Sequence, residues 1–273
     1  MKIAFVVLGL LMMIAASVAN GSGCCDKAIE TFERKMETLI AELKSSCQSP
    51  PVASSCQELH EKDPSLESGV YKLVLGTQKI PVYCHMGNFG CGDGGWTPVM
   101  KIDGTKLTFL YDSGFWTNKT VYNSEGGMTG FFDLKETMLP SYWTTPLSKI
   151  CLGMMIHGQI KFVVLDKKAS SLHSLIADGQ YRATSLGRNQ WKTLIGSDAS
   201  LQRNCNKEGF NPVPETWRRV RIGFVANQEN DCRTCDSYVG FGSRGDMSCG
   251  NYAAWGGDNG NRHTTAMGYI LVQ

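Results

Sequence analysis

The residues best suited to chemistry lie near the C-terminus, in a stretch rich in glycine. Asp258, Asn259 and Asn261 place side-chain oxygens on a glycine-containing loop that starts at Trp255. Ca²⁺ takes roughly six to eight oxygen ligands, of which this loop could supply about three or four. An ordinary turn before a final strand, expected over residues 266–272, is the alternative, and we favour it slightly. Calcium is thus the one candidate cofactor.

Three aromatic residues of the same region are candidates for ligand binding. Tyr238, Tyr252 and Trp255 carry flat rings that could stack on the faces of sugars. These residues therefore indicate extracellular glycans or other matrix components as ligands.

The tripeptide Arg244, Gly245 and Asp246 has the sequence that integrins recognise, and it lies between cysteines in a Gly-rich stretch. A basic and an acidic side chain held apart on a tight glycine turn can bridge an acceptor site and a receptor-bound metal. A chain of this length contains the tripeptide by chance roughly 5–10% of the time, and most chance copies are inert. Integrins are therefore a candidate partner that the motif alone does not establish.

Two further patterns nearby favour structure over catalysis. Residues 240–245 have the Gly-x-Gly-x-x-Gly pattern of dinucleotide-binding proteins. In those proteins a helix begins at the motif, whereas residues 246–250 cannot begin a helix and too little chain remains for a βαβ unit. Cys232 and Cys235 could form half of a zinc site or a redox pair. Because there is no second Cys-x-x-Cys, structural disulfides are favoured for these cysteines in an oxidising compartment.

The sequence lacks the motifs of common enzyme classes. It has no Gly-x-Ser-x-Gly elbow, no His-Glu-x-x-His and no phosphate loop, and its five histidines are scattered. We therefore expect a binding or structural protein that has no catalytic site.

The N-terminus predicts secretion. Lys2 precedes an almost unbroken apolar run over residues 3–15, and the small residues Ser17 and Ala19 mark a cleavage site after Ala19. The alternative is a membrane anchor, but the run is shorter than the roughly 20 residues that a span requires. No later stretch is long and apolar enough to span a bilayer. We expect a signal peptide over residues 1–19 and an extracellular mature chain.

The composition agrees with that location. The chain of 273 residues is 42% hydrophobic and 19% charged, and its net charge of +2 gives no reason to expect nucleic acid or acidic membranes as partners. All 11 cysteines follow the signal peptide, so we expect disulfides, with at least one thiol unpaired or linked to another chain. Asn118 begins an N-glycosylation sequon in a polar stretch.

A helical neck is predicted over residues 24–48. Within it, apolar residues recur at spacings of three and four on an otherwise charged segment, as in a heptad seam. The seam consists of Ile29, Phe32, Met36, Leu39 and Leu43. So short a seam is too weak to hold chains together alone, and a single amphipathic helix packed on its own domain is the alternative.

The cysteines that flank this segment favour an oligomer. A straight helix from Cys25 to Cys47 would be about 33 Å long. A disulfide requires Cα atoms within roughly 7 Å, so Cys24 and Cys25 cannot reach Cys47 in the same chain. We therefore expect interchain disulfides at these three cysteines and a disulfide-linked homo-oligomer. Residues 49–55 are polar and proline-bearing, and they read as a linker.

Four motifs then follow in order and mark the start of a second domain over residues 56–273. They indicate short strands separated by glycine-rich turns. The motifs are Cys56, Ser68-Gly69-Val70-Tyr71, Val82-Tyr83-Cys84 and Gly94-Gly95-Trp96-Thr97. This order resembles the opening of fibrinogen-related domains and of their intelectin-like relatives.

The resemblance implies an α+β fold: a loop-rich, disulfide-bonded domain like the fibrinogen C-terminal domain, in which Cys56 pairs with Cys84. Members of the family are typically lectins or ligand-binding ends of secreted oligomers. The rest of the domain lacks the family's central tryptophan-rich block and its paired-Asp calcium loop. The whole chain is most similar to secreted proteins of the coral skeletal organic matrix, and no ligand residues carry over from other relatives.

Beyond the four motifs, the best strands are expected over residues 107–111, 151–156 and 160–165. Taken together, the sequence predicts a secreted extracellular matrix component with a lectin-like domain, in a biomineral matrix by resemblance. The alternatives are an adhesion protein that presents its Arg-Gly-Asp motif to integrins, and a soluble innate-immune lectin.

Overall fold

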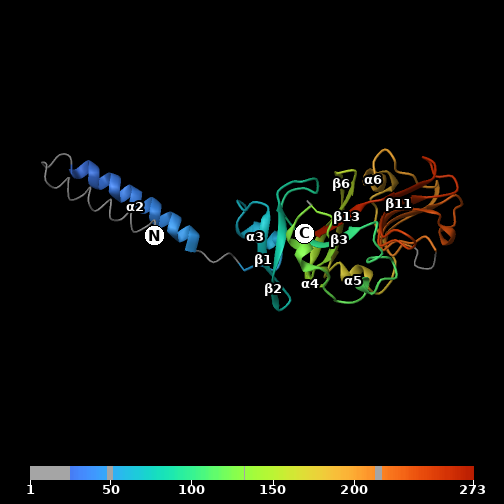
Figure 1. Cartoon of the computed structure of the whole chain (residues 1–273), viewed down its shortest axis with the longest axis horizontal. Helices are drawn as coiled ribbons and strands as arrows, with labels where there is room; N and C mark the ends of the chain where they lie inside the picture. Colours follow the sequence, from blue (N-terminus) through green and yellow to red (C-terminus); the bar gives the residue numbers. More distant parts are fainter. Residues whose placement is uncertain (1–24, 48–51, 132, 213–216) are drawn as a thin grey trace. The chain divides into compact units, whose positions relative to one another are not determined.

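The computed structural model describes residues 25–47, 52–131, 133–212 and 217–273. The chain divides into two units, residues 1–50 and 51–273. In the first unit, helix α2 (Cys25–Cys47) covers the helix predicted over the neck (Figure 1). Within this chain Ile29, Met36 and Leu39 of the apolar seam are exposed and Phe32 is half-buried. The predicted signal peptide and residues 49–51 of the predicted linker lie outside the described residues.

The second unit contains two antiparallel sheets. The first has the strand order β1-β2-β3-β13-β5-β6, with β4 paired to β3. Its strands are β1 (Gly69–Leu75), β2 (Gln78–Met86), β3 (Gly95–Asp103), β4 (Thr137–Met138), β5 (Leu147–Ile156), β6 (Gln159–Ala169) and β13 (Met267–Val272). Figure 1 shows that the C-terminal strand β13 lies beside β3, although the two are far apart in sequence.

The second sheet has the order β12-β11-β10-β9-β8-β7 and is built from the C-terminal part of the chain. Its strands are β7 (Arg182–Ala183), β8 (Asn204–Phe210), β9 (Ile222–Asn227), β10 (Ser237–Phe241), β11 (Cys249–Ala253) and β12 (Arg262–Thr265). Every residue of β9 and β10 is buried, so this sheet is covered on both faces at its centre.

The helices of the second unit are short, and most of them lie between strands in the sequence. They are α3 (Cys56–Lys62), η1 (Gly114–Trp116), η2 (Ser124–Met128), α4 (Ser141–Thr144), α5 (His173–Ile176), α6 (Arg188–Thr193) and η3 (Cys232–Thr234). Helix α3 starts where the Ser55 hydroxyl accepts a hydrogen bond from the Glu58 amide at 3.1 Å, which satisfies one of the free N–H groups of the first turn.

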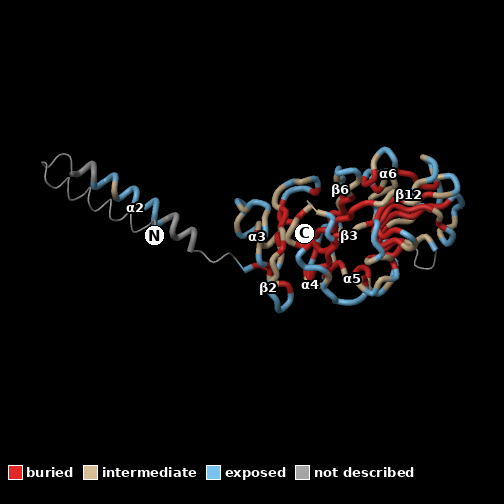
Figure 2. Tube along the Cα trace, viewed as in Figure 1, coloured by how far each residue is buried: buried red, intermediate tan, exposed pale blue. Residues whose placement is uncertain are grey.

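One hydrophobic core joins the two sheets. It includes the fully buried Trp116 and Trp191 together with side chains from β3, β5, β13, β9 and β10. Figure 2 shows the buried residues concentrated along the strands of both sheets. Trp96 is fully buried in a smaller cluster that includes side chains of β13.

Within the described part of the chain, three disulfides join segments that are distant in sequence. Cys56 of α3 and Cys84 of β2, the pair that the resemblance implied, are bonded, with Cα atoms 5.4 Å apart. The other two bonds are Cys91–Cys151 and Cys205–Cys232. Among the described residues Cys235 and Cys249 are unpaired, and both are buried. The second unit is therefore an α+β, disulfide-rich fold.

One of the predicted strands is wrong. Residues 107–111 are irregular, although Phe109 and Tyr111 are buried in alternation as in a strand. Their backbone groups form hydrogen bonds with groups that do not belong to a neighbouring strand. The Tyr111 amide donates to the Ser243 carbonyl at 2.9 Å, and the Leu110 carbonyl accepts from the Trp116 indole at 3.0 Å. The predictions over residues 151–156, 160–165 and 266–272 fall within β5, β6 and β13, apart from the first residue of the last.

Among the residues that the structure describes, no helix combines the length and the apolar character needed to cross a membrane.

Candidate functional site

The Arg-Gly-Asp motif lies on the loop between β10 and β11. The loop closes on itself where the Gly242 amide donates to the Ser248 carbonyl at 2.7 Å. Gly242 is required there, because its φ is +64° and a Cβ would lie 2.5 Å from the Trp116 ring. The Arg244 amide donates to the Arg219 carbonyl at 3.0 Å, so the loop is fixed to the segment that precedes β9.

A groove with a volume of about 640 Å³ opens beside this loop. Three segments that are far apart in sequence form its walls, and we call it the Trp217 groove. Its lining residues are Leu107, Leu110, Asp112, Ser113, Trp217, Arg218, Arg244, Gly245 and Asp246. The Trp217 side chain is 64% exposed and Leu107 is also exposed, so the groove offers apolar surface to a ligand.

Charged groups surround that apolar surface. Asp112 accepts from Arg219 at 2.7 Å and lies 3.3 Å from the Arg244 side chain, so one carboxylate links two guanidinium groups. The Arg244 guanidinium also lies 4.7 Å from the centre of the Trp217 ring. The Arg219 guanidinium in turn stacks on Tyr111, 4.3 Å from the ring centre. The groove therefore combines an aromatic face with several arginines.

The acidic residue of the motif points to solvent. The Asp246 side chain is 70% exposed and accepts a hydrogen bond from His263 Nε2 at 3.0 Å. This hydrogen bond lowers the pKa of Asp246. Because both partners are exposed, water screens the pair and it holds the carboxylate only weakly. Both charged side chains of the tripeptide thus have partners in their own chain, but Asp246 remains accessible.

The predicted sugar-binding aromatics do not form one site. Tyr238 is fully buried, so it cannot meet a sugar, and that prediction is wrong. Tyr252 is half-buried, and the Arg218 guanidinium lies 3.7 Å from the centre of its ring. Trp255 is 77% exposed but does not line the Trp217 groove. Only Trp255 of the three presents a large open ring.

In the loop after Trp255, where calcium was the candidate and an ordinary turn the slightly favoured alternative, the carboxylate is engaged by groups of its own chain. The Asp258 carboxylate lies 3.0 Å from Arg188 and 2.9 Å from Lys192, and it also accepts from the Leu201 amide. Burial raises the pKa of Asp258, but these hydrogen bonds outweigh it and the pKa is lowered. A carboxylate already neutralised by two cations has no position left for a third. The other two predicted ligands are Asn259, whose side-chain amide donates to the Ser197 carbonyl, and Asn261, whose backbone carbonyl accepts from Arg262.

The remaining predicted positions are separate from the groove. Asn118 is exposed just after η1, where a glycan could be attached, and its occupancy stays a prediction. Cys24 lies outside the described residues. Cys25 and Cys47 are the end residues of α2, whose terminal side chains are not described, so the interchain bonds also stay a prediction.

Sequence reasoning missed Trp217 and its arginine neighbours. The consecutive residues Trp217, Arg218 and Arg219 were the one available signal, since an aromatic ring and guanidinium groups can form cation–π contacts. No sequence pattern indicates that Asp112 and Arg244, more than a hundred residues apart, face the same groove.

Neither the family models nor the curated proteins that were compared with this chain contain a match.

Proposed function

We propose that this protein is a secreted, non-enzymatic component of an extracellular matrix, and that its second unit binds acidic glycans in the Trp217 groove. The observation that carries the proposal is the Trp217 side chain, 64% exposed beside the Arg244 guanidinium. A sugar ring could stack on the indole face while its carboxylate or sulfate group accepts hydrogen bonds from Arg244 and Arg218.

Sequence features support the setting. The signal peptide predicted over residues 1–19 supports secretion, and the disulfides suit an oxidising compartment. The resemblance of residues 56–97 to fibrinogen-related domains supports a lectin-like role. The resemblance to coral skeletal matrix proteins supports a biomineral matrix over a soluble immune lectin.

Retention on immobilised polysaccharides tests the proposal. The mature chain is applied to heparin, which is sulfated, to alginate, which is carboxylated, and to dextran, which is neutral. We expect retention on heparin and alginate that salt weakens, and none on dextran, because guanidinium groups select the anions. We expect a calcium chelator to change nothing, since Asp258 is occupied by Arg188 and Lys192. Equal retention on dextran, or none on the acidic supports, would refute the proposal.

We also propose that α2 joins chains into a disulfide-linked oligomer. The support is the exposed seam of Ile29, Met36 and Leu39, which a second copy could cover. The secreted protein should migrate as an oligomer on a non-reducing gel and as a monomer with reductant. Replacing Cys24, Cys25 and Cys47 by serine should remove the covalent oligomer. A Cys249→Ser control should not, because that thiol is fully buried.

A second candidate function is cell adhesion, and the exposed Asp246 side chain is the observation that favours it. An integrin would bind the carboxylate through its metal and would have to displace Arg244 from Asp112. In a cell-attachment assay on coated protein, Asp246→Glu should abolish attachment and His263→Ala should leave it intact. Equal attachment to the wild type and to Asp246→Glu would exclude this function.

A further inference from the structure

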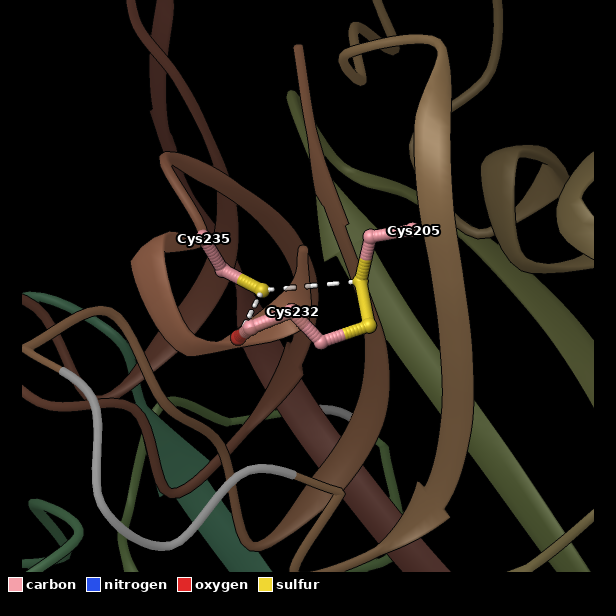
Figure 3. Close-up of side chains that lie close together, drawn as sticks. All are labelled: Cys205, Cys232 and Cys235. Atoms are coloured by element: carbon pink, nitrogen blue, oxygen red, sulfur yellow. Dashed lines mark hydrogen bonds between the residues drawn. A yellow bond between two sulfur atoms is a disulfide. The ribbon is translucent and has the colours of Figure 1, made fainter. Parts of the chain in front are cut away.

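Three cysteines lie together, one in strand β8 and two in the segment between β9 and β10. Cys205 and Cys232 are joined by a disulfide, and Cys235 is a free thiol whose Sγ lies 3.7 Å from Cys205 Sγ (Figure 3). The three sulfur atoms all lie within 4.8 Å of one another. The Cys235 thiol donates a hydrogen bond to the Cys232 carbonyl at 2.9 Å, which holds its sulfur beside the disulfide.

Local backbone geometry brings these sulfurs together. Strand β8 has an irregular register against β9 between Asn204 and Lys207. At this bulge Cys205 and Asn206 adopt positive φ angles of 66° and 52°, which non-glycine residues rarely do. The bulge lets Cys205 reach the short helix η3, which carries Cys232 at its start and is followed by Cys235. In a regular strand, successive side chains point to opposite faces of the sheet. The bulge changes this pattern at Cys205 and places its sulfur near those of Cys232 and Cys235.

We propose that Cys205, Cys232 and Cys235 form a thiol–disulfide exchange site that exposes Cys232 as a site of modification. The Cys235 thiol loses its proton to solvent, and its side chain rotates to bring the thiolate into line with the Cys205–Cys232 bond. The thiolate then attacks Cys205 Sγ. A bond forms between Cys235 and Cys205 as the Cys205–Cys232 bond breaks, and Cys232 leaves as a thiolate. One disulfide replaces another, so no oxidant or reductant is consumed.

The two isomers differ in which thiol faces outward. Cys235 is buried whereas Cys232 is partly exposed, so exchange converts an enclosed thiol into an accessible one. The accessible Cys232 thiolate can then attack an external disulfide, which forms a mixed disulfide at Cys232 and releases one external thiolate. In this second step the external disulfide is the oxidant. Once Cys232 is blocked, its thiolate can no longer reverse the exchange, and the chain remains the Cys205–Cys235 isomer.

The surroundings of Cys235 keep the exchange slow at neutral pH. Burial raises the pKa of the Cys235 thiol to about 12, with further contributions from the carboxylates of Asp236 and Asp231. Lys207 acts in the opposite direction. Only a small fraction of thiolate is therefore present near pH 7, and this fraction rises about tenfold with each pH unit below the pKa.

Tryptic mapping after treatment with oxidised glutathione tests the proposal, because cleavage after Arg203, Lys207, Arg221, Arg233 and Arg244 puts each cysteine on its own peptide. The folded full chain is incubated with the probe at pH 7 to 9, quenched in acid and mapped without reduction. We expect glutathione on the peptide of Cys232, together with a Cys205–Cys235 crosslink. Adduct formation should accelerate about tenfold per pH unit.

Three variants extend the test. Cys235→Ser should lose the adduct at Cys232, whereas Cys249→Ser, which removes the other buried thiol, should retain it. Cys232→Ser should fold with a Cys205–Cys235 disulfide in place of the original bond. A folded Cys232→Ser protein in which both other thiols react with iodoacetamide would overturn the proposal.

The wild type alone can also refute the site. Glutathione found on Cys235 with the Cys205–Cys232 bond intact would mean direct modification without exchange. The absence of any adduct on these three peptides at pH 9 would mean that the sulfurs do not exchange. Either result overturns the proposal whether or not the variants fold.

Discussion

Replacing Trp217 by alanine should weaken binding of an acidic glycan. The expected loss of binding free energy follows from the area of the Trp217 ring that a sugar would cover. A tryptophan side chain presents on the order of 250 Å². Trp217 is 64% exposed, which corresponds to about 160 Å², and a sugar stacked on one face would cover about half of it. At ~25 cal/mol per Å² the lost contact contributes about 2 kcal/mol, or about a 30-fold rise in Kd.

The assay is a titration with a heparin oligosaccharide of defined length at constant ionic strength. Trp255→Ala is the matched control, because Trp255 is also a highly exposed tryptophan but does not line the groove. We expect Trp255→Ala to leave Kd within about twofold, and both variants to unfold at the urea midpoint of the wild type because neither side chain is packed in the core. A larger loss in Trp255→Ala than in Trp217→Ala would move the ligand site to the loop after β11. Unchanged affinity in both variants would refute the stacking argument.

Three further predictions concern charge, pH and covalent structure. Asp112→Asn should strengthen binding to heparin and steepen its salt dependence, because it removes a negative charge that lies 3.3 Å from Arg244; weaker binding by equilibrium titration would contradict this. Burial lowers the pKa of His85 from 6.5 to about 4. As the pH falls, the imidazole therefore takes up a proton in the unfolded chain before it does so in the folded one. The free energy of unfolding should drop by about 3 kcal/mol between pH 6.5 and 4. Urea titrations should show that this drop is smaller in His85→Phe, and an identical pH profile would count against a buried neutral imidazole. Replacing Cys56 and Cys84 by alanine frees a loop with a sequence separation of 28 and should cost about 3–4 kcal/mol in urea unfolding, whereas a loss below about 1 kcal/mol would mean that the bond does not constrain the unfolded chain.

The elements with a strong local pattern could be predicted from the sequence. The spacing of apolar residues over the neck predicted α2, and the strand-like segments over residues 151–156, 160–165 and 266–272 predicted β5, β6 and β13. Residues 107–111 show where such patterns fail. Phe109 and Tyr111 alternate inward as in a strand, but a strand also needs a neighbour in register, and their hydrogen bonds go to the Arg-Gly-Asp loop and to Trp116. No window of sequence contains that information.

The candidate sites were less predictable because distant segments assemble them. The Trp217 groove requires Asp112, Trp217 and Arg244 to meet, and the exchange site requires a bulge in β8 to direct Cys205 toward η3. The pattern Cys232-x-x-Cys235 favoured structural disulfides, but only Cys232 is bonded, and its partner lies outside the motif. The two cysteines that are close in sequence are not the two that are joined.

The candidate calcium ligand Asp258 has a physical lesson that also applies to the groove. A polar side chain can bind a ligand only if its hydrogen-bonding groups are not already used within the protein. The carboxylate oxygens of Asp258 already bind Arg188, Lys192 and the Leu201 amide. Trp217 is the opposite case, because its ring lies largely in solvent with the Arg244 guanidinium beside it. Exposure of a large apolar surface costs free energy in water. A ligand that covers the Trp217 ring removes this surface from water, and the free energy released favours binding. The strongest test of function is therefore at Trp217, whose surface remains open, and not at Asp258, whose sequence context first suggested a site.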